Sequence, residues 1–170
     1  MLELYLAALT LGSVDFSGVH QYLHGMREVV KTALVPYTPA QMFALVADFE
    51  RYPEFVPWVS ESKVLERGGD YVVGRLSMHR AGVRESFTTR NTLRAPERID
   101  MQLIQGPFKS LEGVWTFDDL AGRGTKVGLS MRFEFANAML SLLLSRSFEK
   151  NCAQLVDAFV ARAREAYAGD

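Results

Sequence analysis

Alternating apolar and polar residues run through the middle of the chain, between residues 59 and 135. Residues 125–135 give the clearest example: each odd position from Val127 to Phe135 is apolar, while the even positions carry lysine, glycine, serine, arginine and glutamate. Successive side chains of a strand point to opposite faces, so this stretch predicts a strand with one dry and one wet face. Turn sequences with glycine or proline punctuate the region, which indicates an antiparallel meander.

The other predicted strands of this region share one apolar face. Their inward positions are Val83, Phe87, Leu93, Ile99, Met101, Leu103, Leu111, Trp115 and Phe117, all at odd numbers. In the strand after Asp70 the phase shifts to even positions, with Val72, Leu76 and Met78 apolar. The pattern therefore predicts a sheet whose entire inner face needs a cover.

A strand and a helix are predicted before this region. Residues 27–35 are rich in β-branched residues and end at Val35-Pro36, which predicts the first strand. Thr38-Pro39 is a typical helix start, with Thr38 as N-cap and proline at the first helical position. Residues 51–58 carry two prolines, which permit only a short helical turn between them.

A long amphipathic helix is predicted at the C-terminus, capped by Asn137. Phe148, Cys152, Leu155 and Phe159 follow helical spacing and form its apolar face. We expect a break near Ser145, because an unbroken helix over residues 138–167 is long for a domain of this size. Residues 139–144 are apolar nearly all round the helix. They are expected to line a cavity mouth, to contact a membrane or partner, or to pack under the loop at 55–58.

These elements predict an α+β fold in which a seven-stranded, curved antiparallel sheet wraps around the long C-terminal helix. The inner face is rich in aromatic and methionine side chains. In one interpretation, these side chains fill the space between the sheet and the helix completely. The alternative is an apolar cavity, because polar residues interrupt the inward register at Glu85, Thr89, Asn91 and Gln105. Unpartnered polar groups are unfavourable in a solid core, whereas a ligand site needs a few of them, unless these residues lie at solvated strand ends.

Composition favours one globular domain. The 170 residues are 48% hydrophobic and carry 19 basic and 20 acidic side chains, for a net charge of −1, which gives no support to DNA binding. The single cysteine, Cys152, excludes an internal disulfide and favours the cytoplasm. Residues 26–170 are predicted to form the domain, and residues 1–25 an extension outside it, with an additional surface helix as the alternative.

No catalytic constellation, metal site or cofactor motif is predicted. His20 and His24 have a spacing that suits metal binding on a helix, but they lie in the predicted extension, and His79 stands alone. Gly122-Arg123-Gly124 lies in a predicted hairpin and is therefore no nucleotide loop. Glu85 is the best single candidate for acid–base chemistry, because burial would raise the pKa of its carboxyl group.

Three segments resemble a known family. They are residues 48–58 (DFERYPEFVPW), residues 106–117 (GPFKSLEGVWTF), and Phe133-Glu134-Phe135 followed by Phe148-Glu149 and Ala158-Phe159. Together they are similar to the coenzyme Q-binding START-like family, which includes the ribosome association toxins and is often described as polyketide cyclase/dehydrase and lipid transport. The resemblance runs from about Arg27 to Tyr167. It implies a helix-grip fold with a hydrophobic tunnel between the sheet and the last helix, with 53–58 and 106–108 near the ligand path.

The resemblance implies a protein that binds a hydrophobic ligand, with ubiquinone as the expected ligand and a carrier or chaperone role in respiration. Peripheral contact with the inner face of the membrane is an expectation. Two alternatives stay open: a toxin that binds the large ribosomal subunit and blocks subunit association, and an aromatic polyketide cyclase or dehydrase. The expected ligand-binding residues are Phe55, Trp58, Phe87, Asn91, Met101, Leu103, Gln105, Phe108, Trp115, Phe117, Met131, Phe133, Leu143, Phe148, Leu155 and Phe159.

Overall fold

The protein was analysed as a computed structural model that describes residues 25–80 and 82–169. Its elements are β1 (Arg27–Val35), α3 (Pro39–Ala47), η1 (Phe49–Glu54), β2 (Val59–Arg67), β3 (Tyr71–Arg80), β4 (Val83–Arg94), β5 (Arg98–Gln105), β6 (Phe108–Asp119), β7 (Thr125–Phe135) and α4 (Ala138–Ala166). The predicted extension over residues 1–25 lies, apart from Gly25, outside the described residues.

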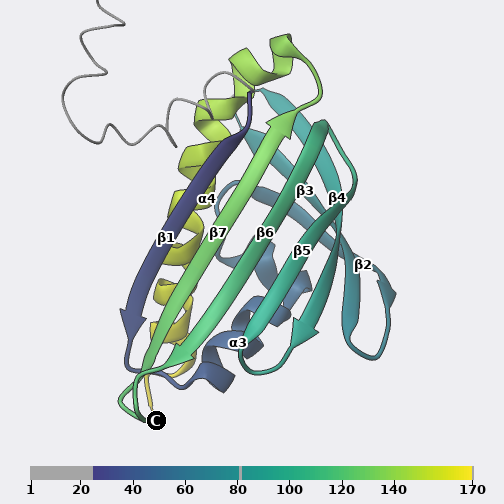
Figure 1. Cartoon of the computed structure of the whole chain (residues 1–170). Coiled ribbons are helices and arrows are strands. Elements are labelled where there is room, and N and C mark those ends of the chain that lie inside the picture. The colour runs from purple at the N-terminus through teal and green to yellow at the C-terminus, as the bar shows by residue number, and fades with distance from the viewer. Residues whose placement is uncertain (1–24, 81, 170) are drawn as a thin grey trace, which may run out of the picture.

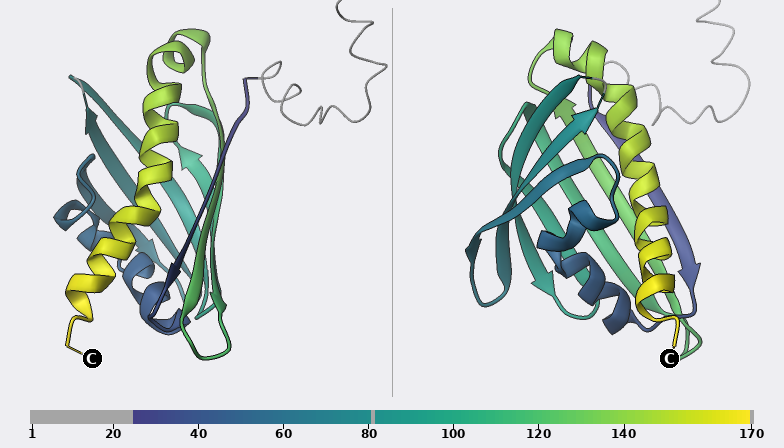
Figure 2. Two further views of the ribbon diagram at one scale, coloured as in Figure 1. Left: turned by 90° about the vertical axis from the view of Figure 1, so that its left-hand side faces the viewer. Right: turned by 180° about the vertical axis from the view of Figure 1, so that it is seen from behind.

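All seven strands form one antiparallel sheet in the order β1-β7-β6-β5-β4-β3-β2 (Figure 1). The sheet curls, and α4 crosses its inner face with α3 and η1 beside it (Figure 2). The predicted helix-grip architecture and its element order are confirmed.

The alternation along β7 sets the position of the core. Its odd residues from Val127 to Phe135 are buried, whereas its even residues from Lys126 to Glu134 are exposed or half-buried. The odd residues of β6 from Leu111 to Phe117 behave in the same way, with Trp115 and Phe117 almost fully buried. These two neighbouring strands therefore present a continuous apolar surface to α4.

Helix α3 starts as the sequence predicts. The Gln41 backbone N–H donates to Thr38 Oγ1 at 3.2 Å, and the Thr38 N–H donates to Gln41 Oε1 at 2.9 Å, which completes a capping box. Met42, Phe43 and Val46 are buried on its inner face. The short helical turn expected between Pro53 and Pro57 lies earlier in the chain: the 3₁₀-helix η1 contains Pro53 and ends at Glu54. Its Tyr52 hydroxyl donates to the Val46 carbonyl at 2.6 Å.

The expected break in the last helix is wrong, because α4 runs without interruption for 29 residues. The Leu140 N–H donates to Asn137 Oδ1 at 2.9 Å, so the predicted N-cap is confirmed. No glycine or proline occurs between residues 138 and 166, so nothing in the chain breaks the helix. At 1.5 Å per residue α4 is about 43 Å long, whereas an 11-residue strand such as β7 spans about 37 Å. Its first turns extend past the end of the sheet (Figure 2).

Gly74 provides a test of how tightly η1 packs on the sheet. A Cβ atom at this buried β3 position would lie 2.3 Å from the Phe49 ring of η1. We therefore expect Gly74→Ala to lower the free energy of unfolding by roughly 1–3 kcal/mol, as overpacking does. Chemical denaturation measures this change. Gly69→Ala is the matched control, because its Cβ would have no neighbour within 4 Å; an equal loss in both variants would contradict the packing argument.

Candidate ligand-binding cavity

An apolar cavity lies between the sheet and α4. The cavity has a volume of about 70 Å³. All the empty space around it, including open solvent, amounts to about 850 Å³. Its walls are formed by Val46, Ala47, Phe49, Tyr52, Trp58, Val59, Val72, Leu76, Met78, Phe87, Thr89, Asn91, Leu93, Ile99, Met101, Leu111, Trp115, Met131, Phe148, Asn151, Cys152 and Leu155. None of these described residues carries a formal charge at neutral pH.

Two aromatic clusters enclose this space along α4. Around Phe148, the rings of Phe133 and Phe108 lie 4.6 and 5.0 Å away between centroids. Around Phe159, the rings of Trp115 and Tyr52 lie 5.2 and 5.1 Å away. Eleven residues separate the two helix positions, or about 16 Å along the axis. The rings within each cluster therefore pack as tightly as in a solid core. The cavity lies between the two clusters.

Methionines form an adjustable part of the wall. Met101 and Met131 lie over Gly113, where a Cβ atom would be 2.4 Å from Met101 Cε and 2.9 Å from Met131 Sδ. Glycine at this position lets both side chains lie flat on β6. Methionine has three rotatable bonds and fills irregular space easily, so this wall can change shape more readily than the aromatic clusters.

Thr89 and Asn91 place polar atoms on the apolar wall. Both point inward from β4 and are buried, and Thr89 Oγ1 donates to Asn91 Oδ1 at 3.0 Å. The Asn91 amide nitrogen has no hydrogen-bond partner among the described residues. It is not fully buried, because no fully buried side-chain nitrogen or oxygen of these residues lacks a partner. It is therefore a free donor that faces the cavity.

Two titratable groups on the wall are held neutral. Burial, followed by the nearby Glu149 carboxylate, raises the pKa of the Cys152 thiol to about 12. Burial, followed by the charge of Asp48, raises the pKa of the Tyr52 hydroxyl. Both groups therefore stay protonated at physiological pH and keep the wall uncharged.

A groove beside the first half of α4 adjoins the cavity. It is lined by Met78, Glu85, Pro107, Phe135, Leu144, Ser147, Phe148 and Asn151. Met78, Phe148 and Asn151 also line the cavity, so the groove and the cavity adjoin. Glu85 is half-buried on the wall of this groove, and it does not line the cavity.

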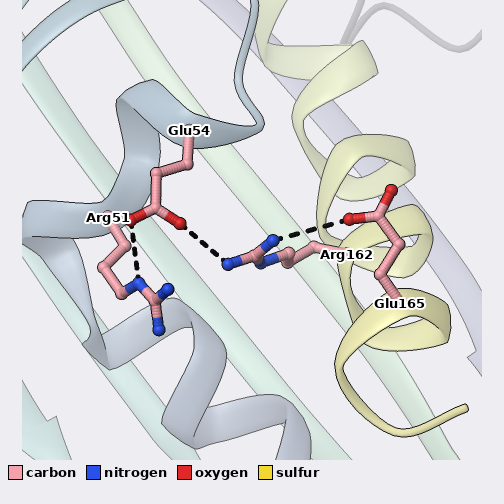
Figure 3. A network of polar contacts seen from close by, with 4 residues as sticks. All are labelled: Arg51, Glu54, Arg162 and Glu165. Carbon is pink, nitrogen blue, oxygen red and sulfur yellow. Dashed lines mark hydrogen bonds and ion pairs between the residues drawn. The ribbon is translucent and has the colours of Figure 1, made fainter.

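The segment from η1 to β2 closes the other side of the cavity and is tied to α4 (Figure 3). Glu54 accepts hydrogen bonds from Arg51 at 2.9 Å and from Arg162 at 2.8 Å. The bond from Arg51 is the main reason that the pKa of the Glu54 carboxyl is lowered. The Arg162 guanidinium also lies 5.4 Å from the Phe55 ring centroid, within cation–π range. Because the groups are partly exposed, the network mainly orients the segment.

Half of the residues expected to bind ligand line the cavity. They are Trp58, Phe87, Asn91, Met101, Trp115, Met131, Phe148 and Leu155. Six others, namely Phe55, Leu103, Phe108, Phe117, Phe133 and Phe159, pack in the core or against it without lining the cavity.

Gln105 and Leu143 lie away from the expected site. Thr89 pairs with Leu103 and Thr88 pairs with Gln105, so a register shift turns Gln105 to the outer face at the end of β5, where it is exposed. Leu143 is exposed at the start of α4. The expected packing of this helix start under the 55–58 loop is wrong, because Phe55 instead contacts Phe159, with 5.0 Å between ring centroids.

The expected residue set omits several wall residues. Asn151 lies three residues after Phe148 and four before Leu155, so helical spacing places it on the cavity face. Thr89 is predicted to point inward, and it lines the cavity although the expected site does not include it. Phe49 and Tyr52 have no readable pattern of their own, because a 3₁₀-helix of six residues is too short to show which face is buried.

Within the described residues, no helix combines the length and apolarity needed to span a bilayer. In the same part of the chain, no three histidine, cysteine, aspartate or glutamate side chains are grouped so that they could hold a metal ion.

Comparisons with known proteins agree with this geometry. Residues 35–160 match the family described as polyketide cyclase/dehydrase and lipid transport. Ribosome association toxin RatA of Escherichia coli strain K12 is 38% identical over 142 residues, which cover 84% of this chain and 90% of that protein. The mitochondrial coenzyme Q-binding protein COQ10 of Drosophila melanogaster is 27% identical over 155 residues, covering 88% of this chain and 61% of that protein.

A solved structure, the Zhui aromatase/cyclase from Streptomyces sp. R1128, has the same fold. Its TM-score is 0.76 at 23% identity, covering 85% of this chain and 98% of that one. The resemblance seen in the sequence is thus confirmed at the level of family and fold, and the chain belongs to the polyketide cyclase/dehydrase and lipid transport family.

Proposed function

We propose that this protein binds an isoprenoid quinone, with ubiquinone as the expected ligand, and carries it in support of respiration without catalysing a reaction. The observation that carries the proposal is the uncharged apolar cavity with one free amide donor, Asn91, on its wall. A quinone matches this arrangement because it joins an apolar tail to a ring whose carbonyl oxygens accept hydrogen bonds. Coenzyme Q binding is named for the Drosophila relative, which supports the same ligand class.

The free-energy terms explain how such a carrier exchanges its ligand. Burial of apolar surface favours binding by about 25 cal/mol per Å² relative to water. A bilayer offers the tail a similar apolar environment, so this term largely cancels when the ligand moves between membrane and protein. The hydrogen bond from Asn91 to the quinone ring then decides which apolar molecule is retained.

The enclosed volume is small, so a long tail cannot lie wholly inside the cavity as it stands. The groove beside α4 provides an exit for the tail, because it shares Met78 and Phe148 with the cavity. Met101 and Met131 can also turn aside over Gly113 and enlarge the cavity. We therefore expect the ring to enter first and the tail to follow the groove.

An Asn91→Leu variant tests the role of the amide donor. Leucine has the same number of side-chain heavy atoms, branched at the same carbon, but no donor, so we expect a short-chain ubiquinone to bind roughly five- to tenfold more weakly. The chain has two tryptophans, and both Trp58 and Trp115 line the cavity, so quenching of tryptophan fluorescence measures binding.

Gln105→Leu is the control, because it makes the same change on the outer face. Thermal unfolding checks that both variants fold. Equal loss of affinity in the two variants would contradict the assigned donor, and no quenching of the wild-type protein by any quinone would contradict the carrier function.

A second candidate is association with the ribosome. The specific observation in its favour is that several relatives with 38–40% identity over 142 residues are named ribosome association toxins. If this candidate is correct, adding the protein to ribosomes lowers the 70S fraction and raises the free subunits in a sucrose gradient. An unchanged 70S fraction, with protein absent from the subunit peaks, would contradict it. The two functions are compatible in one chain, so both assays are informative on the same preparation.

The cyclase or dehydrase alternative stays a prediction. Its best candidate acid, Glu85, lies on the wall of the groove. The described wall residues do not supply an acid–base pair, and the Cys152 thiol stays protonated.

A further inference from the structure

The start of α4 exposes a cluster of large apolar side chains. Met139, Leu142 and Leu143 are 67%, 86% and 64% exposed. Their spacing of three and four residues places them on one face of the helix. This apolar tip, defined by the three residues, belongs to the helix turns that extend past the end of the sheet (Figure 2).

The apolar tip differs from other exposed apolar positions of the described chain. Val30 and Leu34 on β1, Leu65 on β2 and Ile104 on β5 are spread over three strands. Single exposed apolar residues are normal on a protein surface, whereas a cluster within one helical turn marks a contact site.

Two basic residues continue the same face. Arg146 and Lys150 follow Leu142 at intervals of four residues, and both are exposed. Among the described residues, neither of them forms an ion pair. The acidic residue of this half of the helix is Glu149, whose Oε2 lies 3.2 Å from Arg27 Nη1 and is thereby neutralised. The exposed charge behind the tip is therefore positive.

The tip also borders the groove that adjoins the cavity. Leu144, next to Leu143 in the chain, lines the groove, and the groove shares Phe148 with the cavity. Leu144 and Phe148 therefore connect the tip to the groove and the groove to the cavity.

We propose that the apolar tip inserts into the surface of an anionic phospholipid bilayer, with Arg146 and Lys150 contacting the head groups. The occupant is a lipid surface because apolar side chains at the end of a helix, backed by cations on the same face, match the depth profile of a bilayer with anionic lipids. Docking in this orientation holds the groove against the membrane, so an apolar ligand passes into the cavity without crossing water. This second step rests on the proposed quinone-carrier function, whereas the docking itself does not.

Vesicle sedimentation with the full chain tests the docking. The vesicles are phosphatidylcholine alone and phosphatidylcholine mixed with phosphatidylglycerol. We expect the wild-type protein to bind the mixed vesicles more tightly, and Met139→Gln/Leu142→Gln to weaken binding at least roughly tenfold. We expect Arg146→Gln/Lys150→Gln to remove the preference for phosphatidylglycerol. Each lost charge should lower the affinity for the mixed vesicles roughly fivefold at low salt.

Leu34→Gln is the matched control, because Leu34 is a comparably exposed leucine (73%) near the end of β1, and that end lies away from the start of α4 (Figure 1). All variants keep residues 1–24, so any contribution of that segment is the same in each. Wild-type protein that does not sediment with either vesicle, or tip variants that bind as the wild type does, would overturn the proposal. Loss of ribosome sedimentation in the tip variants, with vesicle binding unchanged, would assign the tip to a ribosomal contact and overturn it too.

Quinone titration without vesicles separates this proposal from the carrier function. If the Met139→Gln/Leu142→Gln variant binds quinone as the wild type does but no longer binds vesicles, both proposals are supported. Quinone binding by a wild-type protein that ignores vesicles would overturn docking alone. Vesicle binding without quinone binding would overturn the carrier function and leave docking in place.

Discussion

The structure depends on one constraint: a single helix must cover the inner face of a seven-stranded sheet. The odd side chains of β6 and β7 require this cover, because leaving rings such as Trp115 and Phe133 in water would be strongly unfavourable. One helix is narrower than the sheet, so the sheet must curl around it and other elements must close the remaining side. Helix α3 and η1 provide that closure, and Glu54 ties η1 to α4 through Arg162. The cavity is the space that this arrangement leaves between the two aromatic clusters.

The same constraint explains the length of α4 and what happens at its start. A helix long enough to cover strands of 11 or 12 residues reaches both ends of the sheet. Its first turns go further, and Met139 and Leu142 are therefore outside the core although they are apolar. The groove lies where the helix leaves the sheet, so the groove and the exposed apolar residues occur at one end of the molecule. Ligand exchange and membrane contact are linked in our account by this geometry.

The sequence predicts most of the fold because its patterns are local. Period-two alternation identified the inner face of β7, and the spacing of Phe148 and Phe159 identified the buried face of α4. The features that it did not predict depend on more than one element. A register shift between β4 and β5 decides where Gln105 points, and no pattern within β5 reveals it. The cavity itself depends on how Met101 and Met131 fit over Gly113, which is set by three strands together. The absence of a break in α4 was readable in principle, because no glycine or proline occurs there.

The central claim is that the interior accepts an apolar guest between Phe148 and Trp115. A crystal structure of the protein grown with a short-chain ubiquinone tests it most directly. We expect electron density for the quinone ring beside Trp115, with a carbonyl oxygen within hydrogen-bond distance of the Asn91 amide nitrogen. An interior filled by Met101, Met131 and the aromatic side chains, with no density for the quinone, would contradict it.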